Sequence, residues 1–240
     1  MNIVDPQNFV DGAVLLFDKP YGWTSFDVVN KVKWKLKYHF KLKIKIGHAG
    51  TLDPLATGLV IVCTGKMTKT IDQIQALTKT YDGSLMLGAT TPSFDLETEI
   101  NNTFPTDHID ESAIAHVQEK FVGTIEQTPP IYSAIKMDGK RLYDFARQGK
   151  SVEIKSRPIT IYDLQLDTAN FPEVQFKVVC SKGTYIRTLV DDIGKALDSG
   201  AYLKSLRRTQ IGDYNLADAI SIDDFEKKIE AISQITLPDL

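Results

Sequence analysis

The sequence predicts an α+β protein with a mixed, largely antiparallel central sheet flanked by helices and loops. Short runs of β-branched and other apolar residues indicate strands, and longer segments with apolar residues every three or four positions indicate helices. The two kinds of segment do not alternate strictly along the chain, as they would in a doubly wound parallel sheet. A mixed or antiparallel sheet with helices packed on it is therefore the expected architecture.

The first elements follow from local patterns. The apolar run at 13–17 is typical of a buried strand, and the turn after it contains Pro20 and Gly22. Thr24 or Ser25 can cap the following helix, whose apolar residues at 28, 29, 32 and 36 keep helical spacing. Lysine alternates with aliphatic residues over 41–46, which predicts a strand with one solvated face. A glycine-rich segment at 47–58 then leads into a second buried strand at 59–63.

The later elements are three strands, three helices and one long loop. Strand patterns cover 81–87, 159–166 and 174–179, and helical spacing covers 114–121, 186–197 and 223–232, the second of these ending near Gly200. Residues 127–150 contain two prolines and several basic residues without long apolar periodicity, which is typical of an exposed and functional loop. We therefore expect a main domain at 1–212 that contains this loop, and a short C-terminal extension at 213–240.

Composition narrows the class of protein. Hydrophobic residues make up 42% and charged residues 25% of the 240-residue chain, as in ordinary globular proteins. No apolar run approaches the ~18 residues of a membrane-spanning helix, and the N-terminus lacks the pattern of a secretory signal. We therefore expect a cytoplasmic protein without a membrane partner. Cys63 and Cys180 each lie beside a β-branched run and are expected to be buried thiols, and no Cys/His spacing resembles a zinc site.

Charge is unevenly distributed along the chain. The net charge is −3, yet no acidic residue occurs between Asp27 and Asp53. A polyanion can bind a basic face of an acidic protein because its attraction is local and screened beyond ~10 Å. A lysine run is also typical of a merely solvated helix face, so charge alone leaves both interpretations open. The stretch contains Lys31, Lys33, Lys35, Lys37, Lys41, Lys43 and Lys45.

The segment at 47–58 carries the strongest chemical signal. It places three glycines, His48 and Asp53 within twelve residues between two predicted strands. Glycines let backbone approach a ligand closely, and Pro54 restricts the chain beside Asp53. A carboxylate held on a rigid turn suits a nucleophile or general base. A loop aspartate that only forms an Asx turn fits the same residues.

This segment, Gly47-His48-Ala49-Gly50-Thr51-Leu52-Asp53-Pro54-Leu55-Ala56-Thr57-Gly58, resembles the catalytic motif of the TruB family of pseudouridine synthases. Four further segments resemble motifs of that family and occur in the family's order, over roughly residues 12–208. They are Asp18-Lys19-Pro20-x-Gly22-x-Thr24-Ser25, Lys79-Thr80-Tyr81, Lys182-Gly183-Thr184-Tyr185-Ile186-Arg187 and Leu206-Arg207-Arg208.

The resemblance implies the pseudouridine synthase fold and a catalytic domain at 1–212, with roles for individual residues. Asp53 would attack or deprotonate the target nucleoside, Arg187 would pair with Asp53, and Tyr81 would stack on the target uracil. His48 would fill the space that the flipped base leaves in the RNA. The resemblance further implies substrate-binding roles for Tyr185 and Leu206 in the pocket, for Lys19, and for Lys136, Lys140 and Arg141 in an RNA-binding thumb loop at 127–150.

The implied reaction is conversion of uridine to pseudouridine at position 55 in the T-loop of tRNA, without a cofactor or metal. The implied partner is the tRNA T-arm, and we expect a monomer. Alternatives are an RNA-binding or tRNA-folding protein, a pseudouridine synthase acting on another RNA, and a carboxylate-dependent hydrolase, although no second acid partner is evident. Many bacterial relatives carry a C-terminal PUA barrel, but the 34 residues after Leu206 are too few for one.

Overall fold

The computed structural model describes residues 5–133, 136–137, 140–141 and 154–236. The chain forms two compact units, one of residues 1–79 with 207–240 and the other of residues 80–206. The first unit contains α1 (Gln7–Asp11), β1 (Val14–Lys19), α2 (Ser25–Phe40), β2 (Ile46–His48), β3 (Thr57–Thr64), η1 (Gly65–Thr70), α3 (Ile71–Ala76), the end of β12 (Ala201–Ile211), β13 (Tyr214–Asn215), η2 (Leu216–Asp218) and α7 (Ile222–Thr236). The second contains β4 (Lys79–Leu87), β5 (Ala89–Thr90), β6 (Asn102–Thr103), α4 (Glu111–Phe121), β7 (Gly123–Gln127), β8 (Lys136–Met137), β9 (Lys140–Arg141), β10 (Arg157–Asn170), β11 (Glu173–Cys180), α6 (Ile186–Ala196) and the start of β12.

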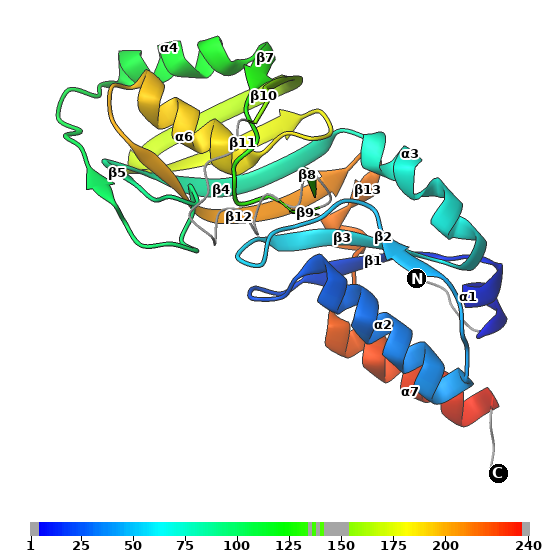
Figure 1. Cartoon of the computed structure of the whole chain (residues 1–240). Helices are drawn as coiled ribbons and strands as arrows, with labels where there is room; N and C mark the ends of the chain where they lie inside the picture. Colours follow the sequence, from blue (N-terminus) through cyan, green and yellow to red (C-terminus); the bar gives the residue numbers. More distant parts are fainter. Residues whose placement is uncertain (1–4, 134–135, 138–139, 142–153, 237–240) are drawn as a thin grey trace. The chain divides into compact units, whose positions relative to one another are not determined.

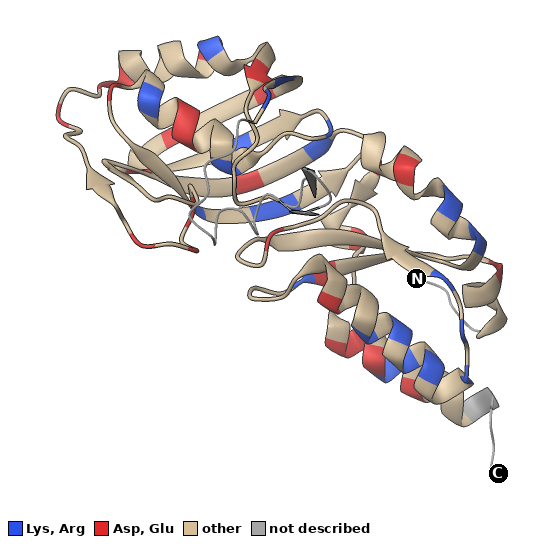
Figure 2. Ribbon diagram, viewed as in Figure 1, with Lys and Arg blue, Asp and Glu red and all other residues tan. Residues whose placement is uncertain are grey.

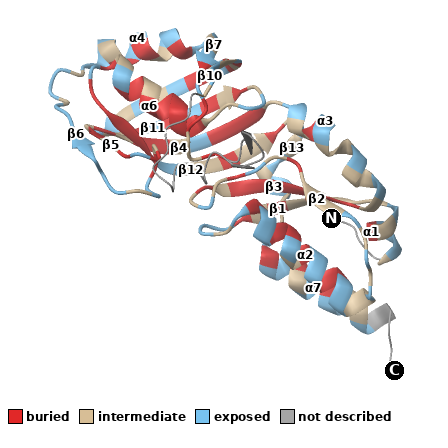
Figure 3. Cartoon of the chain, in the orientation of Figure 1, coloured by how far each residue is buried: buried red, intermediate tan, exposed pale blue. Residues whose placement is uncertain are grey.

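The sheet of the first unit is centred on β3, which is buried along nearly its whole length (Figure 3). β1 and β2 pair with β3 antiparallel, and the end of β12 pairs with it parallel. On β1 the side chains of Leu15, Phe17 and Lys19 are buried on the same face. Phe17 packs edge-on against Phe225 of α7, with ring centroids 5.2 Å apart. Lys19 therefore continues an apolar row, and its burial follows from its place in the strand.

Helix α2 begins as its sequence predicts. The Thr24 hydroxyl accepts from the backbone N–H of Asp27, and the Asp27 carboxylate accepts from the backbone N–H of Thr24, which forms a capping box. The helix ends at Phe40, and its capping residue Lys41 has a φ of 57°, in the left-handed region. This stop fixes where the chain turns back toward the sheet.

The strand predicted over 41–46 is wrong in its extent, because ladder pairing covers only Ile46–His48. The predicted alternation of exposed and buried side chains is present, since the lysines at 41, 43 and 45 are exposed and the aliphatic residues between them are half-buried. Pairing stops because Ile46 lies opposite Thr64, the last residue of β3. Residues 41–45 extend past that end of β3, although the carbonyl of Lys45 still accepts from the amide of Gly65, the first residue of η1.

The second unit is an antiparallel sheet covered on one face by helices α4 and α6 (Figure 1). Its strand order is β12-β4-β11-β10-β7, and β10 pairs antiparallel with both β11 and β7. The core includes Leu85 of β4, Val117 of α4, Val178 of β11 and Leu189 of α6. The predicted mixed, largely antiparallel α+β architecture is therefore confirmed.

Both cysteines are buried thiols outside any disulfide, as the sequence predicts. Within the part of the chain that the structure describes, no helix is long and apolar enough to cross a bilayer.

Candidate active site

The Asp53 loop connects β2 to β3, and its backbone needs glycine at two points. Gly50 and Gly58 have φ of 101° and 102°, in a region that other residues rarely adopt. A Cβ on Gly58 would come within 2.4 Å of the backbone oxygen of Arg208. Gly58 is thus required both for its conformation and because β12 passes directly beside it.

Arg208 holds this loop from the β12 side. It is almost completely buried, and its guanidinium donates to three backbone carbonyls. Nε lies 2.8 Å from the oxygen of Leu59, Nη2 lies 3.1 Å from Gly50 and Nη1 lies 3.4 Å from Thr51. The sequence motif that contains Arg208 gave it no role, and the structure shows that it anchors the segment leading to Asp53.

Ser25, the first residue of α2, also holds the loop. Its buried hydroxyl lies 2.8 Å from the amide nitrogen of Leu52, from which it accepts, and 3.2 Å from the carbonyl oxygen of Leu52, to which it donates. In addition, the amide of Gly22 donates to the carbonyl of Pro54 over 2.9 Å. The residue before Asp53 is therefore bonded to the first residue of α2, and the residue after it to the turn that precedes α2.

Lys19 is the third anchor on that turn. Its ammonium donates to the carbonyl of Trp23 at 2.6 Å, to that of Pro20 at 3.0 Å and to that of Pro54 at 3.4 Å. Burial lowers the pKa of Lys19 to about 8, although the nearby Asp53 carboxylate acts in the opposite direction. The structure thus places this predicted substrate-binding residue where it ties the β1–α2 turn to the residue after Asp53.

Asp53 itself has a half-buried side chain on the loop that these anchors fix. Its backbone carbonyl accepts from the amide of Ala56 over 3.1 Å, which closes a turn around Pro54. A carboxylate on such a frame loses little freedom when substrate arrives, as a nucleophile or base requires.

His48 lies on β2 at the start of the loop, opposite Val62 of β3. Burial lowers the pKa of His48, and the positive charge of Arg208 acts in the same direction, whereas a backbone contact with Gly50 opposes them. The imidazole is therefore neutral at pH 7. A neutral ring can pack against nucleobases without the cost of desolvating a charge.

In the second unit, Tyr81 and Leu206 belong to one apolar cluster. Tyr81 on β4 is 9% exposed, and Leu206 on β12 packs against the cluster that contains Tyr81. Tyr185 precedes α6 and is fixed by Gln127, whose amide side chain bonds both the backbone N–H and the carbonyl of Tyr185. The guanidinium of Arg157 lies 5.3 Å from the centre of the Tyr185 ring.

Arg187, in the first turn of α6, is buried and is held by the chain around residues 93–95. Its Nε lies 3.5 Å from Oδ2 of Asp95, and its Nη1 donates to the carbonyl of Ser93 over 3.1 Å. Its Nη2 donates to the carbonyl of Tyr132 over 2.8 Å. Asp95 is 5% exposed, and no sequence pattern identified it as a partner of Arg187.

The predicted thumb residues lie at the edge of what the structure describes. Lys136 pairs with Arg141, and Met137 with Lys140, in a two-stranded antiparallel ribbon. Of the predicted loop at 127–150, residues 134–135, 138–139 and 142–150 lie outside the described residues.

The predicted residues divide between the two units. The first unit gathers Lys19, His48 and Asp53 around one loop, and the second contains Tyr81, Tyr185, Arg187 and Leu206. The predicted pairing of Asp53 with Arg187 joins the two units and stays a prediction.

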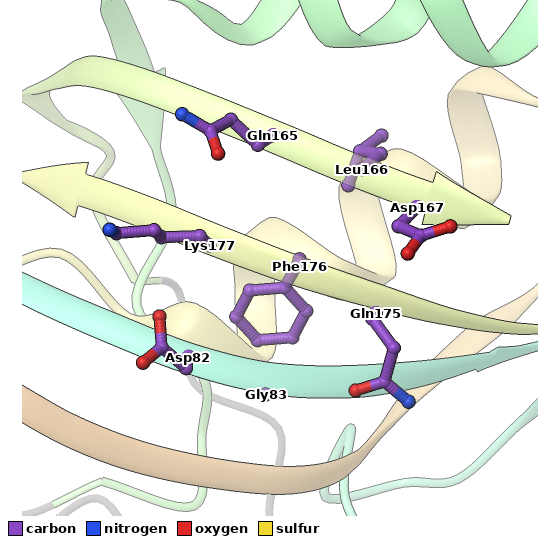
Figure 4. Close-up of a pocket in the computed structure, with 8 residues that line it drawn as sticks. All are labelled: Asp82, Gly83, Gln165, Leu166, Asp167, Gln175, Phe176 and Lys177. Carbon is purple, nitrogen blue, oxygen red and sulfur yellow. The ribbon is translucent and has the colours of Figure 1, made fainter. Parts of the chain in front are cut away.

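A cavity of about 460 Å³ in the second unit contains none of these residues (Figure 4). It is lined by residues of β4, β10 and β11, among them Asp82, Gln165 and Phe176. Within the described residues, no group of three His, Cys, Asp or Glu side chains could hold a metal ion.

Comparison with known proteins decides the family. Residues 35–186 match the N-terminal domain of the TruB family of pseudouridylate synthases, and residues 187–236 match the C-terminal domain of tRNA pseudouridylate synthase B. The chain belongs to the TruB family. The family resemblance predicted from the motifs is thereby confirmed.

TruB relatives match over nearly the whole chain. The tRNA pseudouridine synthase B of Flavobacterium johnsoniae is 55% identical over 94% of this chain and 99% of its own length. That of Phocaeicola vulgatus is 53% identical over 93% of this chain and 95% of its own length. A crystal structure of a Cbf5–Nop10–Gar1 complex contains a chain with the same fold, at a TM-score of 0.70 and 27% identity. That match covers 96% of this chain but only 58% of the other chain.

Proposed function

We propose that this TruB-family protein converts uridine to pseudouridine at position 55 in the T-loop of tRNA. The observation that carries the proposal is the Asp53 loop, which Arg208, Ser25 and Lys19 hold from separate points of the chain. A loop that needed only an Asx turn would not require so many buried polar anchors. A fixed, half-buried carboxylate in the family's catalytic motif fits an isomerase.

The reaction balances without an external reactant. The bond from N1 of uracil to C1′ of ribose breaks, the base turns, and C5 forms the new bond to C1′. The proton on C5 leaves and N1 gains one, so no electrons enter or leave overall. Asp53 is the group that attacks or accepts a proton, and the proposed enzyme needs no cofactor.

The other predicted residues support Asp53. The buried guanidinium of Arg187 suits a carboxylate that must stay ionised and oriented. Tyr81, Tyr185 and Leu206 would form an aromatic and aliphatic surface for the uracil ring. The neutral His48 would occupy the stack from which the target nucleotide flips.

We also propose the T-arm as the part of tRNA that is recognised, with the loop at 127–150 contributing Lys136, Lys140 and Arg141. The catalytic domain would span 1–212 with a short extension at 213–240, acting as a monomer in the cytoplasm. The alternatives are a synthase for another RNA and an RNA-binding protein without chemistry.

The deciding experiment maps pseudouridine in a transcribed tRNA after incubation with purified protein. Wild type should modify the T-loop uridine, and Asp53→Asn should not, while its tRNA affinity stays within about tenfold, ~1.4 kcal/mol. Asp72→Asn, an exposed carboxylate on α3, is the matched control and should keep full activity. Turnover by Asp53→Asn near the wild-type rate would refute the assignment. Binding by wild type without modification would favour the RNA-binding alternative.

A further inference from the structure

Helix α2 divides its lysines between two sides. Lys31 lies 2.6 Å from Glu226, and Lys35 lies 3.1 Å from Glu226 and 3.0 Å from Glu230, so both pair with acids of α7. In Figure 2, blue positions of α2 and red positions of α7 appear where the two helices lie side by side. Lys33 and Lys37, one helical turn apart, are exposed and form no ion pair with any described residue.

These two lysines line a groove of about 460 Å³ between α2 and the extended segment 42–46. Lys43 and Lys45 line it from the opposite side, and neither forms an ion pair with a described residue. The aliphatic side chains of Leu36 and Ile44 also line the groove. Four exposed positive charges around one groove repel each other, and a bound polyanion would relieve that repulsion.

Two large aromatic side chains lie on the solvent side of the same helix. Trp34 is 53% and Tyr38 is 59% exposed. Their rings are stacked, with centroids 5.1 Å apart and planes inclined by 12°. The inward positions of α2 are already filled by Val28, Val32 and Leu36, so this aromatic pair contributes little to the core. Planar rings beside unpaired lysines are the combination that binds single-stranded nucleic acid.

We propose that this lysine and aromatic face of α2 is a second RNA-binding surface, separate from the Asp53 loop. Lys33, Lys37, Lys43 and Lys45 contact phosphates, and an unpaired base stacks on the Trp34–Tyr38 pair. The inference rests on the proposed function, because that function makes RNA the polyanion this chain handles. RNA fits better than a lipid surface, which would need the aliphatic side chains outermost, whereas they lie in the groove.

The electrostatic part is tested by the salt dependence of tRNA binding. The logarithm of tRNA affinity falls as the logarithm of salt concentration rises. Replacing Lys37, Lys43 and Lys45 with Ala should make this slope shallower by about two to three. The matched control replaces Lys69, Lys120 and Lys228, which are also exposed but lie outside the groove, and changes the net charge by the same amount. An unchanged slope in the first variant, or equal losses in both, would overturn the proposal.

The stacking part is tested by fluorescence. The chain has two tryptophans, so Trp23→Phe leaves Trp34 as the only one. A single-stranded oligoribonucleotide should quench Trp34 emission, and Trp34→Ala should weaken oligoribonucleotide binding about tenfold. Absence of quenching contradicts base stacking. Equal quenching by polyglutamate would instead indicate an acidic protein partner.

The two proposals can fail separately. If wild type forms pseudouridine but the lysine variant keeps its salt slope, the α2 surface is wrong and the proposed function stands. If wild type binds tRNA with a slope that the lysine variant lowers, yet forms no pseudouridine, the surface stands and the proposed function fails.

Discussion

The hydroxyl of Ser25 bonds both backbone polar groups of Leu52, the residue before Asp53. Leu52 is 3% exposed, so water cannot readily replace either bond. The start of α2 and the position of the Asp53 carboxylate are therefore coupled through one side-chain oxygen.

Ser25→Ala should consequently loosen the Asp53 loop. It leaves a buried N–H and C=O without that partner, which should cost about 1–3 kcal/mol of unfolding free energy. Because the loop also positions the carboxylate, kcat for pseudouridine formation should fall more than KM changes. Urea unfolding and steady-state kinetics measure the two effects.

The matched control for that change is Ser221→Ala. The Ser221 hydroxyl accepts from the amide of Asp224 at the exposed start of α7, so its loss costs a helix cap of ~1 kcal/mol. It should leave kcat unchanged. Equal effects of the two variants on kcat would show that Ser25 acts only through global stability.

Lys19 should make stability depend on alkaline pH. Its folded pKa of about 8 lies below its ordinary value of 10.5, so between these pH values the unfolded chain binds more protons than the folded one. The folded state is therefore penalised below pH 8, and the penalty disappears as pH rises to 10.5. Relative to Lys19→Met, which cannot titrate, wild type should gain stability from pH 7 to pH 10 in urea unfolding. A stability difference that stays constant over this range would contradict the assignment.

Asp95→Asn should test the support of Arg187. Losing one partner of a buried ion pair leaves an uncompensated charge, which typically costs about 3 kcal/mol. Turnover should also fall at temperatures where the variant remains folded, because Arg187 loses an orienting contact. The exposed Asp167→Asn on β10 is the control and should change neither. Unchanged turnover in a folded Asp95→Asn protein would show that this contact is dispensable for the reaction.

Gly58→Ala should be far more destabilising than alanine at another glycine of similar φ. Gly123 has φ of 111° but no atom within 4 Å of an added Cβ, so Gly123→Ala carries only the conformational cost of ~1–2 kcal/mol. Gly58→Ala carries that cost plus a collision with the backbone of Arg208. Thermal unfolding of both variants measures the difference. Similar losses would mean that β12 can move away from the loop.

The sequence located most elements and the Asp53 loop because these signals are local. Apolar periodicity, a capping residue and a run of closely spaced motif residues all lie within a few positions of each other. The strand at 41–46 was overextended because a single segment does not reveal where its partner strand ends. Whether Thr24 or Ser25 caps α2 was likewise settled only by the fold, which uses Thr24 as the cap and turns Ser25 toward Leu52.

The contacts that hold the site residues in place could not be predicted from the sequence, because they join segments that are far apart in the chain. Arg187 and Asp95 are far apart in the chain, and a buried aspartate has no local pattern that distinguishes it from a surface one. Arg208 stood in a quoted motif, but its three carbonyl partners follow from the parallel pairing of β12 with β3. The burial of Lys19 depends on α2 and α7 covering β1. Each contact is decided by which segments the topology brings together.

The first unit is built from two segments at opposite ends of the chain, and this affects how it folds during translation. The ribosome must add about 130 residues after residue 79 before the second part of this unit, starting at residue 207, begins to emerge. At roughly 5–20 residues per second, this takes on the order of 6–26 s. During that time β1 lacks Phe225, α2 lacks the acids that pair with Lys31 and Lys35, and the Asp53 loop lacks Arg208. The second unit is one uninterrupted segment, 80–206, and can fold first. The first unit, which needs residues from both ends of the chain, should therefore fold last.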